Sequence, residues 1–356
     1  MNGPSATGGM ADFSQRYQAG VNFGGWLSQY GTFDHDHFEA FVGESDVARV
    51  ADWGFDHVRL PIDYPVLVDD GDADGYSERG FGYVDDCLRW CREHDLDLVL
   101  DLHQAPGYSF STLDENRLFE DEKLQERFVD VWRTFAERYE SAGDEVAFEL
   151  LNEVVHSPDG AWNDLAHRAV EAIRAVDADR DVVVGGERYN SIGALDDITL
   201  VEGDDNVVYT FHFYQPHLFT HQHASWSEVA RAYDTDVEYP GTFPGLDAFL
   251  DDHPEYRDGY GSLVGERIDR EWIEAAVQPA VEFRRETGED LYCGEYGVID
   301  VASADSRVAW YRDVADVLSD LDIGRACWSY REMNFGLVDE NRDVVNEELV
   351  DVVSRT

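Results

Sequence analysis

Lysine is almost absent from this chain of 356 residues: Lys123 is its only lysine, and the other basic residues are arginines. In total 27 basic residues face 76 aspartates and glutamates, which gives a formal net charge of −49. Nucleic acids and anionic membrane surfaces are bound through positive charge. The sequence therefore predicts neither a nucleic-acid partner nor a membrane partner.

Long apolar runs are also missing. No stretch approaches the roughly 18 consecutive apolar residues of a membrane-spanning helix. The start of the chain, MNGPSATGGMADFSQRYQAG, has no basic segment followed by an apolar core, as a signal peptide would. We therefore expect a cytoplasmic protein, secreted only if a longer N-terminus exists. We expect about the first 15 residues to be flexible, because chain termini often are.

Cysteine is scarce as well. Cys87 and Cys91 are four residues apart on a predicted helix, and Cys293 and Cys327 fall in two apolar strands. This spacing matches no metal or redox motif. We therefore expect all four to be reduced, small hydrophobic residues.

The abundant acidic residues are spread along the whole chain rather than gathered in a tail. With 43% hydrophobic and 13% aromatic residues, the composition favours a folded core over a disordered acidic protein. An acidic, strongly hydrated surface suits molar salt, where the Debye length is only about 3 Å. The composition therefore predicts a halophilic protein.

Short apolar runs alternate with amphipathic segments along the chain. Eight runs read as strands: 19–25, 56–61, 97–103, 146–152, 181–186, 206–214, 290–296 and 323–330. The helical segments are 44–53, 81–94, 122–142, 160–176, 191–197, 268–287, 304–322 and 344–354. Strands that are apolar on both faces and alternate with helices are typical of parallel sheets.

Eight such units predict a single (β/α)8 TIM barrel over 1–356. An open doubly wound sheet is the alternative, but GVNFGG after the first strand lacks the GxGxxG pattern of a phosphate loop. The connection 215–265 after the sixth strand is unusually long. Long insertions of this kind are often functional, so we expect it to lie over the cleft.

Polar or aromatic side chains stand at the carboxyl ends of six predicted strands, where barrel enzymes place their sites. They are Arg59, His103, Asn152, Glu153, His212, Tyr214, Glu295 and Trp328. Each alone has an ordinary explanation, such as a helix cap, a buried ion pair or a core histidine. Six strands that all end in this way indicate an active site.

Two carboxyl groups in one pocket suggest glycosidic bond cleavage, in which one is a proton donor and the other stays ionised. We expect Glu295 to be the nucleophile and Glu153 the acid/base. Asn152 would bind the sugar 2-hydroxyl, and Arg59 and Tyr214 would orient Glu295. His103 and His212 would line the pocket, and Trp328 would offer a flat face to a pyranose ring.

These motifs, VRLP, DLH, LNE, HFY, GEYG and WSY, resemble those of glycoside hydrolase family 5, the cellulase-like clan A enzymes. The match runs from about Gly20 to Asp339, and the catalytic pair falls on the fourth and seventh strands, as in that family. The resemblance implies a retaining mechanism, no cofactor, and a β-linked oligo- or polysaccharide substrate. A retaining mechanism predicts carboxyl groups about 5–5.5 Å apart.

Several alternatives stay open at this point. The enzyme could be an endo-β-1,4-glucanase, an exo-acting β-glucosidase or β-mannosidase, or a β-1,3-glucanase, and a catalytically silent sugar-binding barrel is the non-enzyme alternative. The chain could be a monomer or a small homo-oligomer.

Some segments have no assigned role yet. The loop 216–226 contains three histidines without the spacing of a metal site, and its Trp226 could stack on substrate. Other candidates for the cleft wall are 33–38, Asn22, Trp26, Arg331, Glu332 and Asn334. The tryptophans at helical spacings, Trp53, Trp90, Trp132, Trp162, Trp272 and Trp310, are expected in the core.

The charge predicts that stability depends on salt. Mutual repulsion of the acidic groups is screened in molar KCl and exposed in dilute buffer. We expect the midpoint of thermal unfolding, followed by circular dichroism, to fall when KCl is reduced from molar to millimolar concentration. A midpoint that stays unchanged would refute the halophilic interpretation.

Overall fold

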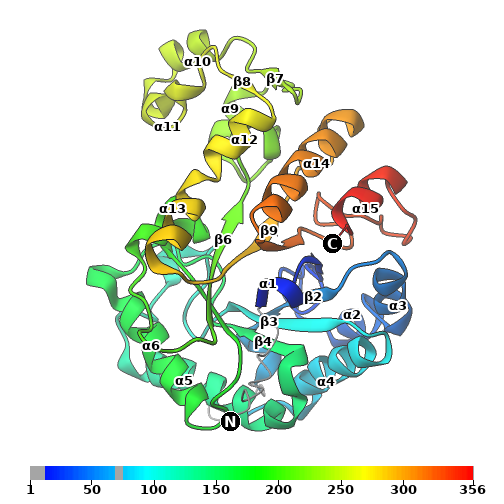
Figure 1. The fold of residues 1–356 in the computed structure, drawn as a ribbon, viewed down its shortest axis with the longest axis vertical. Helices are drawn as coiled ribbons and strands as arrows, with labels where there is room; N and C mark the ends of the chain where they lie inside the picture. The colour runs from blue at the N-terminus through cyan, green and yellow to red at the C-terminus, as the bar shows by residue number, and fades with distance from the viewer. Residues whose placement is uncertain (1–12, 69–74, 356) are drawn as a thin grey trace, which may run out of the picture.

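Eight parallel strands form a closed barrel in the computed structural model, which describes residues 13–68 and 75–355 (Figure 1). Around the barrel the strands follow the order β1, β10, β9, β6, β5, β4, β3, β2. Their bounds are β1 Ala19–Asn22, β2 His57–Asp63, β3 Asp97–Gln104, β4 Val146–Glu149, β5 Val182–Gly185, β6 Val207–Phe213, β9 Leu291–Tyr296 and β10 Gly324–Cys327. The predicted (β/α)8 barrel and its eight strands are confirmed.

Helices surround the barrel. They are α1 Phe13–Arg16, α2 His35–Ala40, α3 Glu44–Asp52, α4 Glu78–Glu93, α5 Glu122–Tyr139, α6 Ala161–Arg174, α7 Glu187–Asn190, α8 His217–Thr220, α9 Glu228–Tyr233, α10 Leu246–Asp252, α11 Arg257–Tyr260, α12 Arg270–Ala276, α13 Gln278–Thr287, α14 Ala304–Asp320 and α15 Glu347–Val353. The single helix expected over 268–287 is wrong, because α12 ends at Ala276 and α13 begins two residues later with Pro279 in its first turn. Proline cannot donate the hydrogen bond that a continuous helix needs there. The weak helix expected over 191–197 is a 3₁₀ helix, Ile192–Asp197.

An apolar layer closes the amino-terminal end of the barrel. Phe13 and Tyr17 stack with their ring centroids 4.3 Å apart, and Phe13 meets Tyr292 edge to face at 5.6 Å. Of the stretch expected to be flexible, residues 1–12 lie outside the described residues. Residues 13–15 instead belong to α1, because Phe13 is buried in this layer.

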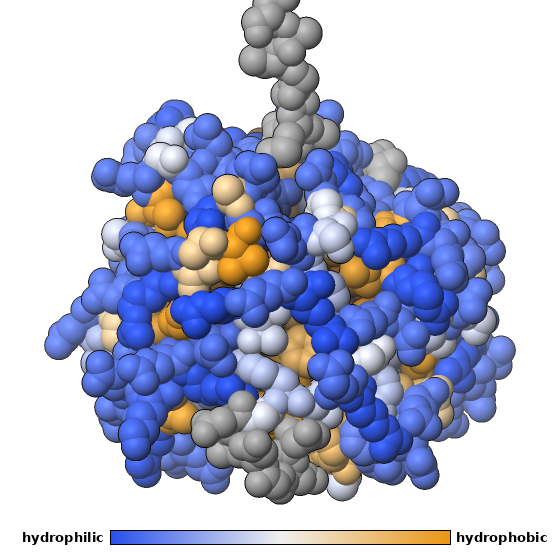
Figure 2. Space-filling model, turned by 90° about the horizontal axis from the view of Figure 1, so that it is seen from below, coloured by the Kyte–Doolittle hydropathy of each residue, from blue (hydrophilic) through white to orange (hydrophobic). Residues whose placement is uncertain are grey.

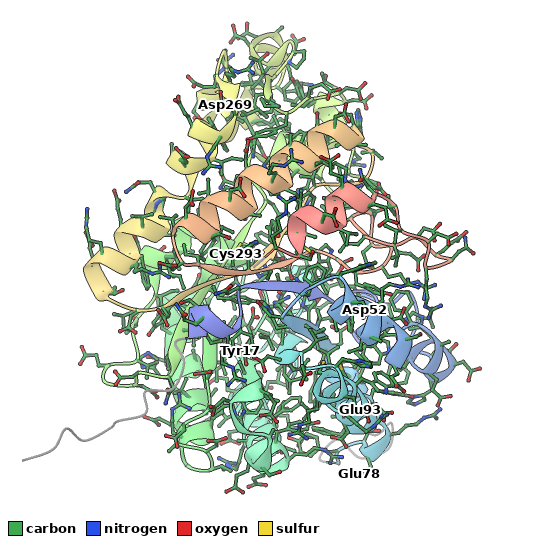
Figure 3. All side chains as sticks on the ribbon, turned by 45° about the vertical axis from the view of Figure 1, so that its right-hand side comes forward. Tyr17, Asp52, Glu78, Glu93, Asp269 and Cys293 are labelled. Carbon is green, nitrogen blue, oxygen red and sulfur yellow. The ribbon has the colours of Figure 1, made fainter. Side chains whose placement is uncertain are left out.

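The insertion after β6 forms a lobe at one end of the molecule, at the top of Figure 1. It contains α8 to α11 and a short antiparallel pair, β7 Gly241–Thr242 and β8 Arg267–Ile268. Tyr239 attaches this lobe to α14, because its hydroxyl donates to Asp313 at 2.6 Å and its backbone N–H donates to Ser306 at 2.9 Å. Asp269 at the start of α12 and Glu78 at the start of α4 lie at opposite ends of the molecule (Figure 3).

Apolar residues fill the interior and hydrophilic residues cover most of the surface, as the composition suggests. All four cysteines are free and buried, and Cys293 lies in β9 inside the molecule (Figure 3). Trp132, Trp162 and Trp310 are fully buried, whereas Trp53, Trp90 and Trp272 pack against the core with part of their surface exposed. Figure 2 shows a face that is mostly hydrophilic with scattered small apolar patches. None of the described helices is long and apolar enough to cross a membrane.

Two glycines in α4 predict opposite effects on stability. A Cβ on Gly80 would collide with the backbone carbonyl of Val66, which cannot move without shifting the chain. Gly80→Ala should therefore lower the free energy of unfolding by about 1–3 kcal/mol. Gly82 has no neighbouring atom within 4 Å of such a Cβ. Gly82→Ala should raise that free energy by about 0.5–1 kcal/mol, because alanine stabilises a helix interior relative to glycine. Urea unfolding in molar KCl measures both, and an equal effect of the two variants would contradict this packing.

Candidate active site

One buried arginine lies at the centre of the site. Arg59 Nε and Nη2 donate to Glu149 at 2.7 and 2.9 Å. Its Nη1 donates to Asn22 and to Glu295, both at 2.8 Å, and Nη2 donates to Asn152 at 3.0 Å. Each N–H group of the guanidinium therefore has an acceptor, which fixes its position and its plane.

Three carboxyl groups surround this single cation. Asp101 adds a contact of 3.1 Å to Arg59 Nη2, beside those of Glu149 and Glu295. Burial alone would lower the pKa of Arg59, but the charges of Asp101, Glu149 and Glu295 outweigh it and hold the pKa well above its ordinary value. Arg59 is thus a permanent positive charge inside the barrel.

Both carboxylate oxygens of Glu295, the fifth residue of β9, are hydrogen-bonded. Arg59 donates to Oε1 at 2.8 Å, and the hydroxyl of Tyr214 donates to Oε2 at 2.8 Å. Burial and the charge of Glu295 raise the pKa of Tyr214 well above its ordinary value, so its hydroxyl keeps the proton that it donates. These two donors hold the carboxylate in one orientation.

Glu153 lies four residues beyond the end of β4 and has a positive φ of 45°. A residue with a Cβ adopts this left-handed conformation at a cost of about 1–2 kcal/mol. Tyr108 supports the turn, because its hydroxyl donates to the Glu153 carbonyl at 3.1 Å and accepts from Val155 N–H at 2.8 Å. The turn directs the Glu153 side chain into the site, where it is 14% exposed and lies 2.9 Å from His212 Nδ1.

The carboxyl groups of Glu153 and Glu295 lie close together. One oxygen of each, together with a ring nitrogen of His212, lies within 4.8 Å of the others. Inverting glycosidases keep their carboxyl groups about 6.5–9.5 Å apart, whereas retaining ones place them at about 5–5.5 Å. The observed spacing fits the retaining arrangement.

The environment of Glu153 favours the protonated acid. Burial raises its pKa to about 7, against the opposing influence of His103 and Arg59. Burial also lowers the pKa of His212 to about 4, so this imidazole is neutral at pH 7. No cation therefore lies beside Glu153 on its His212 side, and the proton stays on the carboxyl group up to neutral pH.

His103 and Trp328 form another wall of the site. Their rings are parallel to within 8°, with centroids 5.8 Å apart. His103 is held by Asp101 at Nδ1, 2.7 Å away, and by the Gln29 amide at Nε2, 2.9 Å away. Burial lowers the pKa of His103, so this side of the site is uncharged. His103 is 0% exposed and Trp328 is 5% exposed, so of the two rings Trp328 is the one with accessible surface.

All eight predicted site residues thus meet at the carboxyl end of the barrel, but two partners of Arg59 were missed. Asp101 and Glu149 are fully buried, and their Cα atoms are paired across β3 and β4. A signal was present: Asp101 stands two residues before His103 and therefore shares its face of the strand. Glu149 is likewise an isolated charge inside an apolar run, and such a charge needs a partner.

The histidines of the loop 216–226 are accounted for by contacts within the protein. His217 and His221 stack with centroids 4.4 Å apart, and His217 bonds to Ser227 at 2.9 Å. His223 contacts two aspartates of the lobe, Asp234 and Asp236. Trp226 is 54% exposed and meets His221, which in turn meets Tyr214, so this loop borders the site.

The other candidates divide into site and scaffold. Asn22 belongs to the site, because it joins Arg59 to the backbone carbonyl of Gly294 at 3.0 Å. Trp26 is wrong as a pocket residue: it is 1% exposed and donates to a backbone carbonyl. Arg331 binds the backbone carbonyl of Phe41 at 2.9 Å, so its guanidinium is engaged within the protein.

Within 13–68 and 75–355, one group of side chains has the spacing of a metal site, namely Glu153, His212 and Glu295. Arg59 and Tyr214 already occupy both oxygens of Glu295. A metal cation there would also be repelled by the adjacent guanidinium. The donor set therefore fits acid–base chemistry better than metal binding.

The sequence is similar to known cellulases over almost its whole length. Residues 19–334 match the model of the family "Cellulase (glycosyl hydrolase family 5)". The chain is 44% identical to endoglucanase C of Acetivibrio thermocellus over 339 residues, which covers 95% of this chain and 98% of that protein. It is 36% identical to cellodextrinase A of Ruminococcus flavefaciens, with coverage of 86% and 84%.

Solved structures show the same fold. The Cel5A structure of Thermotoga maritima in complex with cellobiose superposes with a TM-score of 0.77 at 22% sequence identity, covering 96% of this chain and 98% of that one. A complex of the same enzyme with mannotriose gives the same TM-score. The family match and the endoglucanase relative cover most of the chain and agree with the geometry of the site. The protein belongs to glycosyl hydrolase family 5 and is an O-glycosyl hydrolase.

Proposed function

We propose that this protein is a retaining endo-β-1,4-glucanase that uses Glu295 as nucleophile and Glu153 as acid/base. One observation carries the proposal: two carboxyl groups with atoms within 4.8 Å of each other have opposite surroundings. Glu295 receives hydrogen bonds on both oxygens, whereas burial raises the pKa of Glu153 to about 7. One group is thus ready to attack and the other to donate a proton.

In the first step Glu295 Oε attacks the anomeric carbon. The bond from this carbon to the leaving oxygen breaks as Glu153 gives its proton to that oxygen. A glycosyl ester forms on Glu295, and Glu153 is left as a carboxylate. Arg59 and Tyr214 hold the attacking carboxylate in place, so the reaction pays little entropy to orient it.

In the second step the Glu153 carboxylate takes a proton from water. The oxygen of that water attacks the anomeric carbon from the side the leaving group has vacated, and the ester bond to Glu295 breaks. Two inversions give net retention. Glu153 regains its proton and Glu295 its charge, so the site returns to its starting state.

The remaining residues bind the sugar in this proposal. The Asn152 amide, oriented by its bond to Arg59, faces the 2-hydroxyl, whose hydrogen bond strengthens in the transition state. Trp328 stacks on the pyranose ring, and the buried His103 packs parallel to it. His212 stays neutral and leaves the proton of Glu153 in place.

The relatives support a β-1,4-glucan substrate, since the 44% identical protein is named an endoglucanase. The 36% identical relative is named a cellodextrinase, which keeps action on short oligosaccharides as the second candidate. The product profile described below distinguishes endo-β-1,4 action from the exo-acting and β-1,3 alternatives. The presence of both carboxyl groups argues against a silent sugar-binding barrel.

We also propose that the enzyme is halophilic and consists of one catalytic domain. The net charge of −49 supports the first proposal, and the hydrophilic face in Figure 2 agrees with it. Attachment of the lobe to α14 through Tyr239 supports the second. The oligomeric state stays a prediction.

The product profile tests the function. Cello-, laminari- and manno-hexaose are incubated with the enzyme in molar KCl, and the fragments are followed over time. We expect mid-chain fragments from cellohexaose, whereas stepwise loss of single sugars would indicate exo action.

Glu295→Gln is the matched control, because it keeps the shape of the side chain and removes the nucleophile. It should lose at least about 10³-fold in kcat while still binding cellohexaose, and unchanged turnover would refute the mechanism.

The protonation of Glu153 predicts the alkaline limb of the pH profile. Only the protonated acid helps a sugar alcohol to leave, and its pKa is about 7. For cellotetraose, kcat/KM should fall about tenfold for each pH unit well above 7. β-Cellobiosyl fluoride needs no proton on a sugar oxygen, so its kcat/KM should not show this limb. The same alkaline limb for both substrates would contradict the assignment of Glu153.

A further inference from the structure

The loop after β1, residues 23–30, lies on the side of the site away from Glu153. In the barrel β1 is adjacent to β2 and β10, and it lies across from β5, the neighbour of the strand that precedes Glu153. A Cβ on Gly24, at the start of this loop, would collide with the Trp328 indole at 2.6 Å. Further along the loop, the Gln29 amide nitrogen lies 2.9 Å from His103 Nε2. The loop therefore borders the wall that Trp328 and His103 form.

Contacts with the ends of β2 and β3 fix this loop. The Ser28 hydroxyl donates to Asp63 Oδ1 at 2.7 Å, and the Asp63 N–H donates to the Leu27 carbonyl at 3.0 Å. The Gln104 amide donates to the second oxygen of Asp63 at 3.0 Å. Gln29 has a φ of 54°, a left-handed conformation that a residue with a Cβ keeps only when its surroundings impose it. Gln29 is thus presented to the site by a strained turn that is held at several points.

The hydrogen bonds of His103 decide which way the Gln29 amide faces. Asp101 Oδ2 lies 2.7 Å from His103 Nδ1 and 3.1 Å from Arg59 Nη2, so this oxygen is an acceptor and Nδ1 carries the hydrogen. Burial lowers the pKa of His103, so the imidazole is neutral and its Nε2 is itself an acceptor. Gln29 must therefore turn its NH2 group toward Nε2, because an acceptor there needs a donor.

The amide oxygen of Gln29 is left to accept from a different donor. Gln29 is half-buried, whereas His103 is 0% exposed, so of these two side chains Gln29 is the one that substrate can touch. Trp328 N–H donates to the carbonyl of Tyr296, the residue after Glu295, at 2.9 Å. Because Trp328 thus adjoins Glu295, the sugar stacked on Trp328 is the one that Glu295 attacks. Gln29 stands on that side of the scissile bond.

We propose that Gln29 is a specificity-determining residue whose amide oxygen accepts a hydrogen bond from a hydroxyl of the sugar attacked by Glu295. In the proposed function Asn152 already faces the 2-hydroxyl of this sugar, and its 4-oxygen is linked to the preceding sugar. The 3- and 6-hydroxyls are the donors left for Gln29. Asp101 and His103 are positioning residues for this contact, because their hydrogen bonds fix which atom of the amide faces the sugar.

This inference rests on the proposed function, and it predicts a coupling between Gln29 and one hydroxyl. Gln29→Leu should lower kcat/KM for β-cellobiosyl fluoride about three- to tenfold, the effect of one lost hydrogen bond. Two analogues carry fluorine in place of the 3- or the 6-hydroxyl of the sugar that bears the leaving fluoride. Fluorine bound to carbon donates no hydrogen bond. With one of these analogues, Gln29→Leu and the wild type should therefore have the same kcat/KM.

Two further variants separate the contact from the structure of the loop. Gln29→Asn keeps an amide and suits a positive φ, so the turn is preserved, but the amide oxygen is withdrawn by the length of one methylene. It should show the same loss and the same coupling as Gln29→Leu. Gln125 is the matched control, a half-buried glutamine on α5 that accepts from Arg168 at 2.9 Å. Gln125→Leu should leave the ratios of kcat/KM among the three fluorides unchanged.

The outcomes distinguish this inference from the proposed function. If the wild type cleaves β-cellobiosyl fluoride, the roles of Glu295 and Glu153 stand whatever the Gln29 variants do. An equal loss with all three fluorides, or no loss with β-cellobiosyl fluoride, would then overturn the role of Gln29 alone. A wild type that cleaves none of the three fluorides would instead refute the proposed function, and this inference with it.

Discussion

The guanidinium of Arg59 is the constraint on which the site depends. It is fully buried, and a buried charge survives only when it is paired and hydrogen-bonded. Glu149 holds it in a bidentate pair, and Asn22, Asn152 and Glu295 accept its other three hydrogens. The guanidinium cannot rotate without breaking several of these bonds, so its contact with Glu295 is fixed before any substrate binds. Glu295 is therefore oriented by the interior of the barrel, as its proposed role as nucleophile requires.

The same cluster explains why two glutamates in one pocket behave differently. Arg59 is shared by Asp101, Glu149 and Glu295, so little of its charge is left to stabilise a further anion. Glu153 has a neutral histidine as its close partner, and burial raises its pKa to about 7. Asp101 shows how strong the effect of burial is here, since its pKa rises to about 7 although it contacts Arg59 at 3.1 Å. One cation, bound to Glu295 and not to Glu153, thus gives the two glutamates the different surroundings that their proposed roles require.

The sequence predicted the strands and the eight strand-end residues because parallel strands of a barrel end on one face, so polar residues at those ends must converge. It did not predict Asp101 and Glu149: each is an isolated charge that signals the need for a partner, but only the closed barrel brings both beside Arg59. Pro279 in the sequence could have predicted the break between α12 and α13. The left-handed turn of Arg188, Tyr189 and Asn190 contains no glycine, so the sequence gives no signal for it. Tertiary contacts decide such turns, and local sequence preference does not.

Exposed charges and the buried charges of the site respond differently to salt, so substitutions can change the surface charge without changing the site. Exposed acidic groups repel one another over distances that molar salt screens to about 3 Å. The carboxyl groups around Arg59 are shielded from ions by the barrel itself, and burial rather than ionic strength sets the pKa of Glu153. Loss of salt should therefore weaken the fold before it alters the chemistry. The site can therefore stay unchanged while the surface charge varies, because its decisive cation is Arg59 inside the barrel and not a charge on the surface.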